Sequence, residues 1–248
     1  MSRVLLVGEQ SNSIGLEVKG FDCFNSNAYK EDGGVLVKAL EKGGHEVAWM
    51  RTCHAATDFP ESLADLRRYD VVILSDVGAC TLLFHPEMLI KSIPHPNRLK
   101  LLREYVQRGG GVAMVGGWMS FSGIDGKAKY FDSFLEEALP VVCLPYDDRQ
   151  ERPEGVKPTI LQKDHHILKN IPSKWPFFLG YNKVKSRPEA TEILRLDNDP
   201  LLSVWEYGKG RSAAFTTDCA PHWGPVSWLK WSGYGTFWNN LVGWLARS

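Results

Sequence analysis

The stretch GGGVAMVGGWMSFSG, residues Gly109–Gly123, decides the fold. Its apolar run Val112–Val115 leads into a pair of glycines, which predicts a buried strand that ends in a sharp turn. In α/β proteins the tip of such a turn often holds a catalytic nucleophile. Here Trp118 follows the glycines, and Ser120 and Ser122 lie just beyond it. The stretch therefore predicts an α/β fold and leaves open whether the turn is catalytic.

Strand and helix patterns alternate along the first half of the chain. Apolar runs predict buried strands at 4–7, 45–50 and 71–74. Apolar residues at helical spacing predict helices at 35–40 and 63–66, and a third that Asn97 caps and Gly109 ends. Near-continuous apolar strands separated by helices are typical of a parallel sheet with helices on both faces.

The second half of the chain predicts short strands separated by turns. The candidate strands are 181–185, 191–196, 201–207 and 211–217. Gly208 and Gly210 predict a hairpin turn, whereas the polar segment 147–158 predicts a surface loop. A helix with Phe237, Leu241 and Trp244 on its apolar face closes the chain. We expect an antiparallel extension of the same sheet, so that residues 1–248 form a single domain.

Charge and cysteine content exclude several classes of partner. Lys+Arg and Asp+Glu both number 29, so the zero formal net charge predicts neither a nucleic acid nor an anionic membrane as partner and favours a homo-oligomer. No apolar run has the length of a secretory signal or a membrane span. The five cysteines are scattered without metal-ligand or redox spacing. We therefore expect a cytoplasmic protein with reduced thiols, no metal and no cofactor.

The candidate site lies where the predicted parallel strands end, because ligands of open parallel sheets bind outside the carboxyl ends of the strands. The loops there begin at Glu9, Thr52, Asp76, Gly116 and Asp218, and we expect them to converge on one pocket. Candidate ligand-binding residues are Asp76, Gly78, Gly117, Trp118, Met119 and Trp223, and candidate catalytic residues are Ser120, Asp218 and His222. Indole faces beside a few polar groups suit a small polar ligand, such as a sugar or an amino-acid derivative.

Each polar candidate also has a structural interpretation. Asp218 and His222 form either a general base with its orienting carboxylate or a clamp on a Trp-rich corner. Ser120 is either a nucleophile served by His222 or a cap of the following segment, and it lacks the small flanking residues of a nucleophile elbow. Asp76 either binds a ligand or caps the turn after its strand.

Six stretches resemble the class I glutamine amidotransferase-like superfamily and, within it, the putative glutamine amidotransferase group. They occur in the family's order and are KGFDCFNSNAY, YDVVILSDVGA, GGGVAMVGGWMSFSG, DHHILKNIP, LLSVWEYGKGRSAAFTTDCAPHWG and GYGTFWNNLVGWL. The trehalose-utilisation-type proteins are similar more distantly. The resemblance implies a flavodoxin-like three-layer sandwich, with a mainly parallel sheet and an antiparallel C-terminal extension.

The resemblance also implies a mechanism that this chain does not complete. In class I amidotransferases an elbow cysteine, activated by a His-x-Glu pair, attacks the glutamine amide. The resemblance puts the cysteine position on Trp118 or its immediate neighbour, and no cysteine lies between Cys80 and Cys143. The His-x-Glu position falls on Asp218 to His222, and the loop Asp76–Gly78 matches the oxyanion-hole position in outline.

These observations predict a small-molecule-binding or regulatory module without glutaminase activity. One alternative is a hydrolase or transferase that uses Asp218 and His222 without a covalent intermediate. Another is a structural subunit whose Trp-rich C-terminal region forms an oligomer interface. Cys219, beside Asp218, is a fallback nucleophile whose thiolate would need a positive neighbour.

Overall fold

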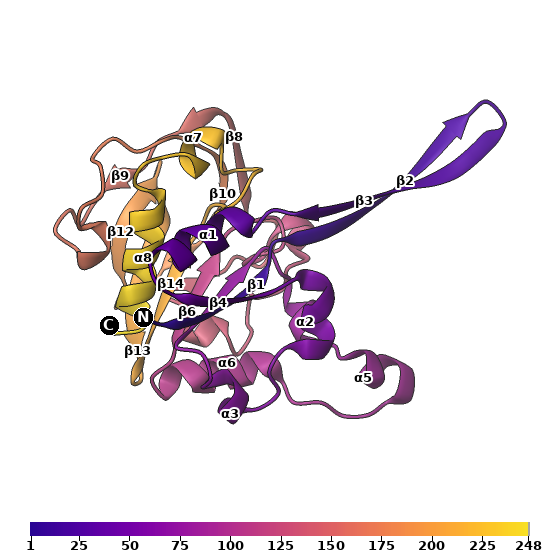
Figure 1. Cartoon of the computed structure of the whole chain (residues 1–248), viewed down its shortest axis with the longest axis horizontal. Coiled ribbons are helices and arrows are strands. Elements are labelled where there is room, and N and C mark those ends of the chain that lie inside the picture. The colour runs from indigo at the N-terminus through magenta and orange to yellow at the C-terminus, as the bar shows by residue number, and fades with distance from the viewer. Residues whose placement is uncertain (248) are drawn as a thin grey trace.

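A central eight-stranded sheet organises the chain, whose residues 1–247 are described here by a computed structural model (Figure 1). The strand order is β4-β1-β5-β6-β14-β13-β12-β9. The parallel strands are β1 (Arg3–Gly8), β4 (Glu46–Met50), β5 (Val71–Ser75), β6 (Gly111–Val115) and β14 (Gly210–Phe215). Counted along the chain, these five lie in the order 2-1-3-4-5, which is the flavodoxin-like order. The predicted fold class is confirmed.

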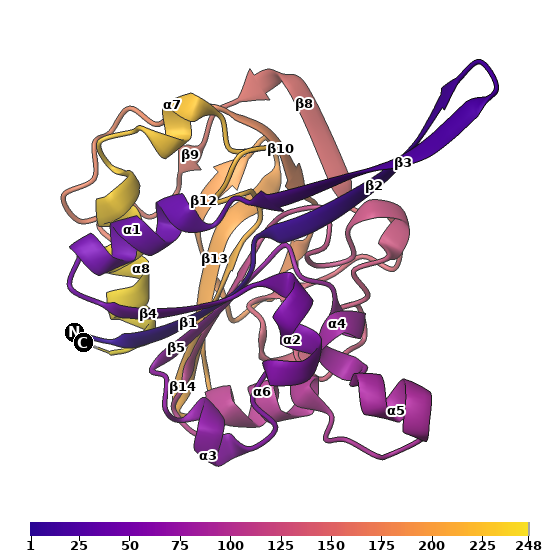
Figure 2. The same ribbon diagram turned by 45° about the vertical axis from the view of Figure 1, so that its right-hand side comes forward.

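Helices cover both faces of the sheet and complete three layers (Figure 2). One face carries α1 (Gly34–Lys42), α7 (Val226–Leu229) and α8 (Tyr234–Leu245). The other face carries α2 (Thr52–Asp58), α3 (Leu63–Leu66), α4 (Ala79–Leu83) and α6 (Arg98–Gln107), with α5 (Pro86–Lys91) projecting beyond them. Strand β1 shows why both faces need covering: Val4 and Leu6 enter one core, and Leu5 and Val7 enter the other.

The antiparallel extension forms at the β14 side of the sheet, as predicted. It consists of β13 (Asp199–Tyr207), β12 (Thr191–Leu196) and β9 (Thr159–Ile160). Tyr207 pairs with Gly210, so Gly208 and Lys209 form a two-residue hairpin turn. Gly208 has a φ of 59°, a conformation that such turns require and that glycine adopts without strain.

The expectation of a surface loop at 147–158 is wrong. Residues Arg149–Val156 form β8, which pairs antiparallel with β10 (Phe178–Asn182). The charged sequence RQERPEGV has no apolar pattern that would indicate a strand. The strand is instead held by its backbone hydrogen bonds to β10. A second small pair joins β7 (Val141–Val142) to β11 (Lys185–Ser186). Three 3₁₀ helices complete the connections: η1 (Ile124–Gly126), η2 (Glu136–Ala138) and η3 (His166–Leu168).

Residues 10–31, for which we predicted no element, form a long antiparallel hairpin. Its strands are β2 (Gln10–Lys19) and β3 (Asp22–Glu31), paired in unbroken register. Figures 1 and 2 both show this hairpin projecting from the sheet as an arm, clear of the helices. Most of its side chains are exposed.

The C-terminal tryptophans serve mainly as core residues within the chain. Trp223, Trp228 and Trp238 are buried, and the Trp228 ring packs against Phe215 and Phe237. The region therefore stabilises α8 on the sheet. Among residues 1–247, no helix is both long enough and apolar enough to cross a membrane.

Candidate functional site

The candidate site forms where β1, β5, β6 and β14 end side by side. Strands β1 and β5 are neighbours at the point where the strand order changes direction, which is where open α/β sheets bind ligands. Glu9 follows β1, Asp76 follows β5, Trp118 follows β6 and Asp218 follows β14. The loop after β4 leads into helix α2, where the Cys53 N–H donates to Gln10 Oε1 at 3.0 Å, beside the loop after β1. His54 on this helix is exposed and lies 3.6 Å from Asp58.

Asp76 and Ser120 join the loops after β5 and β6 by two hydrogen bonds. The Met119 backbone N–H donates to Asp76 Oδ1 at 2.7 Å, and the Asp76 N–H donates to Ser120 Oγ at 3.1 Å. Asp76 has a φ of 48°, which its short polar side chain tolerates. Burial raises the pKa of Asp76, partly offset by the Met119 hydrogen bond. Gly78 lies against Met119, where a Cβ would meet the Met119 methyl at 2.7 Å.

Asn182, from β10, fixes the elbow itself. Its Oδ1 accepts from the Gly117 N–H at 3.0 Å, and its Nδ2 donates to the Gly117 carbonyl at 3.1 Å and to Asp148 Oδ1 at 2.8 Å. Asp148 also accepts from the N–H groups of Ser122 and Gly123. Gly117 has a φ of 148°, and a Cβ there would lie 2.7 Å from Asp76 Oδ1, so only glycine fits.

Trp118 stands at the tip of the elbow with 41% of its surface exposed. Its indole meets the His222 ring edge to face, with 4.9 Å between the centroids. The Arg149 guanidinium lies 5.2 Å from the same indole, in a cation–π arrangement. The indole is therefore partly exposed and lies between a histidine ring and a guanidinium group.

Asp218 organises the loop after β14. Its Oδ2 lies 3.0 Å from His222 Nδ1 and accepts from the Trp223 N–H at 2.9 Å. Burial alone would lower the pKa of His222, but the hydrogen bond and the charge of Asp218 raise it above its usual value. His222 has a φ of 125°, a strained conformation for a residue with a Cβ. Buried Trp223 donates from Nε1 to Glu151 Oε2 at 2.9 Å.

Glu9 is a site residue that the sequence interpretation left unassigned. Its carboxylate is buried at the end of β1, where Oε1 accepts from Ser75 Oγ at 2.5 Å and from Cys219 Sγ at 3.5 Å. Burial, together with the charges of Asp218 and Asp76, raises the pKa of Glu9. Burial likewise raises the pKa of Asp218. The site thus gathers three carboxyl groups that cannot all ionise cheaply, beside a histidine that readily carries a proton.

The two nucleophile candidates, Ser120 and Cys219, lie in different surroundings. Ser120 is buried, with its Oγ engaged by the Asp76 N–H, and within residues 1–247 no hydrogen bond joins it to His222. Cys219 is fully buried, and burial next to Glu9 raises the pKa of its thiol well above the usual value. A thiol in that setting stays protonated and unreactive.

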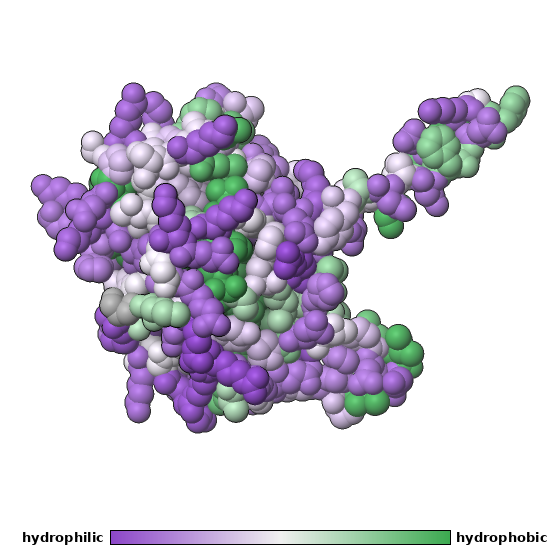
Figure 3. Space-filling model, in the orientation of Figure 1, coloured by the Kyte–Doolittle hydropathy of each residue, from purple (hydrophilic) through white to green (hydrophobic). Residues whose placement is uncertain are grey.

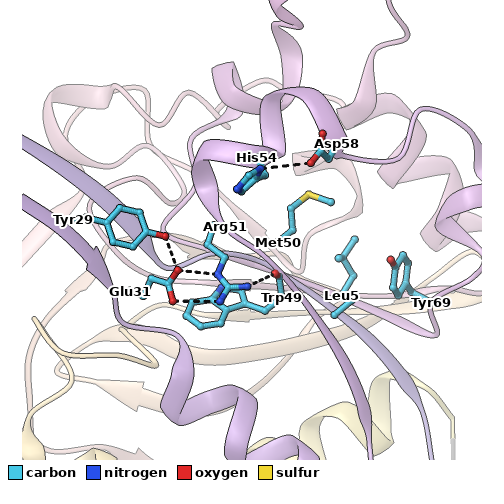
Figure 4. A pocket seen from close by; sticks show the side chains of 10 residues that line it. Leu5, Tyr29, Glu31, Trp49, Met50, Arg51, His54, Asp58 and Tyr69 are labelled. Atoms are coloured by element: carbon cyan, nitrogen blue, oxygen red, sulfur yellow. Dashed lines mark hydrogen bonds and ion pairs between the residues drawn. The ribbon is translucent and has the colours of Figure 1, made fainter.

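Two other polar groupings lie outside this site. A hollow of about 410 Å³ opens at the base of the arm, where Arg51 stacks on Trp49 and pairs with Glu31 (Figure 4). The Trp49 indole N–H donates to the Gly8 carbonyl, so this hollow borders the Glu9 loop without sharing its residues.

The second grouping could in principle hold a metal ion. Among residues 1–247, Glu61, His85 and His95 bring ligand atoms within 4.8 Å of one another. Several of their atoms already have partners: the Arg98 guanidinium donates to Glu61 Oε1 at 2.6 Å, and that same oxygen bonds His95 Nδ1. His95 Nε2 is buried without a hydrogen-bond partner in the part of the chain that the structure describes. His85 Nδ1 accepts from the N–H of Glu87. The grouping ties the α5 segment to the body of the protein.

The fold and this site define a class I glutamine amidotransferase-like protein. Residues 3–247 match the family described as "Putative glutamine amidotransferase", and the chain belongs to that family. Among proteins with curated descriptions, none matches the chain.

Two solved structures of cytoplasmic proteins from Salmonella typhimurium resemble the whole chain. One is 39% identical with a TM-score of 0.94, and the similarity covers 98% of both chains. The other, from strain LT2, is 37% identical with a TM-score of 0.94, covering 98% of this chain and 99% of that one. A β-galactosidase from Rahnella sp. R3 shares the fold alone, at 14% identity and a TM-score of 0.51 over 84% of this chain and 26% of that one.

Proposed function

We propose that this chain is a small-molecule-binding member of its family that does not hydrolyse glutamine. The proposal rests on the elbow tip, where the partly exposed Trp118 falls at or next to the position that the resemblance gives to the family's nucleophilic thiol. Without a thiol at the elbow, the covalent step has no nucleophile. Buried Cys219, with its raised pKa, is a poor substitute.

The ligand we propose is small and polar, with hydroxyl or amino groups. Asp76 and Asp218 bring carboxylate acceptors to one end of the sheet, beside the buried carboxyl group of Glu9, and Trp118 adds an indole face beside His222. Hydroxyl and amino groups donate to carboxylates, and the apolar face of a sugar ring stacks on indole. A sugar or an amino-acid derivative combines both features. The binding site around the ligand would also be lined by Gly78, Gly117, Met119 and Trp223.

A thermal-shift screen tests this proposal with sugars, amino acids and their amino derivatives, beside an assay for ammonia release from glutamine. We expect at least one ligand to raise the melting temperature of the native chain and to leave that of Trp118→Ala unchanged. Phe134→Ala is the matched control, because Phe134 is a similarly exposed aromatic ring beneath an arginine, Arg103. Ammonia release from glutamine that Asp218→Asn abolishes would refute the proposal.

A second candidate function is acid–base catalysis without a covalent intermediate. The observation that favours it is the 3.0 Å contact between Asp218 and a partly exposed, strained His222. If a ligand from the screen is turned over, His222→Ala should abolish turnover and keep binding. His54→Ala is its control, since His54 faces Asp58 at the same sequence spacing on an exposed helix. Turnover that survives His222→Ala would remove this candidate.

We also propose a cytoplasmic location. It rests on the two Salmonella typhimurium relatives, which are described as cytoplasmic proteins. Fractionation of cells that express the tagged chain tests it.

A further inference from the structure

The projecting arm has two chemically different faces. Because β2 and β3 pair in unbroken antiparallel register, side chains directly opposite each other share a face and successive ones alternate. We call one face the apolar arm face; it consists of Asn12, Ile14, Leu16, Val18, Cys23, Asn25, Asn27 and Tyr29. The opposite face carries Glu17, Lys19, Asp22 and Lys30, the half-exposed Phe24 beneath Lys19, and small residues such as Ser13 and Gly15.

The eight side chains of the apolar arm face are uncharged and are not covered by the chain. The same face continues at the base of the arm with Gln10 and with Glu31, whose carboxylate pairs with Arg51. Ile14 is 80% exposed, Leu16 68% and Val18 66%. Phe21, at the tip of the arm, is fully exposed. Figure 3 shows the arm standing clear of the body, with apolar side chains along it and at its tip. An isolated two-stranded hairpin is marginally stable in water, so a ribbon of this length needs a surface that buries its apolar face.

A second copy of this chain fits the apolar arm face better than a charged partner does. Its uncharged side chains do not repel those of a second copy, and Arg51 compensates the charge of Glu31 at the base. A two-fold axis brings the same face from both molecules into contact. Covering the aliphatic and aromatic side chains of the face and the tip would remove roughly 700 Å² per copy, close to the ~800 Å² per partner of a standard interface. The chain also has no net charge that would keep copies apart.

We infer that the apolar arm face is a self-association surface, on which the arms of two copies of this chain pack face to face. Side chains from the two ribbons interdigitate there as they do between the sheets of a sandwich. The opposite face, with its four charged side chains, remains in water. The arm thus acquires the second layer that a two-stranded ribbon lacks.

Light scattering coupled to size exclusion tests the inference on the full chain. The native chain should run as a dimer that dissociates on dilution. Leu16→Lys buries a charge in the interface and should raise the dissociation constant by at least ~100-fold. Ser13→Lys, which adds the same charge to the opposite face of the same strand, should change it less than ~3-fold. A native chain that is monomeric at every concentration, or two variants with equal effects, would overturn the inference.

Thiol reactivity gives a second readout that does not depend on chromatography. Cys23 lies on the apolar arm face and Cys53 lies on α2, and both thiols are exposed in a single chain. In the native dimer Cys23 should react with a thiol reagent at least ~10-fold more slowly than in Leu16→Lys, because the partner arm covers it. Cys53 should react equally in both. Equal rates at Cys23 in the two proteins would contradict the arm-to-arm interface, whatever the mass.

Discussion

Glu9 lies at the carboxyl end of β1 with its carboxyl group enclosed by Ser75 and Cys219. Burial and the neighbouring carboxylates raise its pKa from the usual 4.5 to about 8. At neutral pH it therefore holds a proton, while Asp218 is charged and paired with His222. The site thus combines a neutral acid, Glu9, with an ion pair, Asp218 and His222, where the parallel strands end.

Replacing Glu9 by glutamine should change how stability depends on pH. The folded pKa lies above the unfolded one, so the folded state binds the proton more tightly between about pH 4.5 and about 8. The contribution of Glu9 to the free energy of unfolding therefore falls as pH rises through that window. The amide oxygen of Glu9→Gln can still accept from Ser75. Near pH 9 the free energy of unfolding of this variant, measured relative to that of the native chain, should be higher than at acidic pH by on the order of 1 kcal/mol or more. Urea unfolding at several pH values measures this.

Glu17→Gln is the control for that experiment, because Glu17 is exposed on the arm. Its curve should parallel that of the native chain over the whole pH range. If the curve of unfolding free energy against pH for Glu9→Gln is also parallel to that of the native chain, Glu9 titrates as an ordinary carboxylate and its pKa is not raised.

At the residue scale, the sequence predicted the positions that follow strands and missed their partners. Asp76, Trp118 and Asp218 could be located because a strand end places the next residues at the ligand-binding edge of a parallel sheet. Asn182 lies within a predicted strand, 181–185, but its partners at the elbow could not be predicted, because β8 was expected to be a loop and the pairing of β10 with β8 was missed. Glu151, which accepts from Trp223, lies on that unpredicted strand. Hydrogen-bond partners far apart in the sequence are set by tertiary packing.

Among the elements, the contact between β10 and the elbow after β6 determines where Trp118 stands. Asn182→Ala would leave the N–H and carbonyl of Gly117 and one oxygen of Asp148 without their partner in a buried setting. Unsatisfied buried polar groups cost about 1–3 kcal/mol each, so we expect a loss of ~2–4 kcal/mol in the free energy of unfolding. Equilibrium urea denaturation measures the loss.

Gln162→Ala removes an exposed amide and should stay within ~0.5 kcal/mol of the native chain. A similarly small effect for Asn182→Ala would mean that the elbow holds its shape without β10. Ligand binding in the thermal-shift screen should weaken with Asn182→Ala, because Trp118 follows directly on Gly117.

Elements with an apolar pattern were predictable and elements without one were not. Strands β1, β5 and β6 can be recognised in the sequence as apolar runs because both of their faces are buried. Strand β8 is charged, and the arm is polar on one face, so neither produces a continuous apolar run. The regular alternation Ile14, Leu16, Val18 is a period-two signal that, together with the turn at Gly20, could have indicated the hairpin.

For the whole molecule, the arm and the body have separate sources of stability. The core clusters on the two faces of the large sheet contain no residue of the arm. The arm is held at its base by Arg51, which pairs with Glu31, and by Gln10, whose Oε1 accepts from the Cys53 N–H. The body should therefore fold without the rest of the arm.

Excising the arm tests this separation. Ser11 and Lys30 are directly paired, so Asn12–Tyr29 can be replaced by an Asn-Gly turn that keeps both base contacts. Since no core side chain is lost, the shortened chain should unfold within ~1 kcal/mol of a monomeric Leu16→Lys chain in urea. It should also be monomeric, as the apolar arm face is gone. A shortened chain that is destabilised by several kcal/mol would show that the arm supports the body; one that still dimerises would place the interface elsewhere on the molecule.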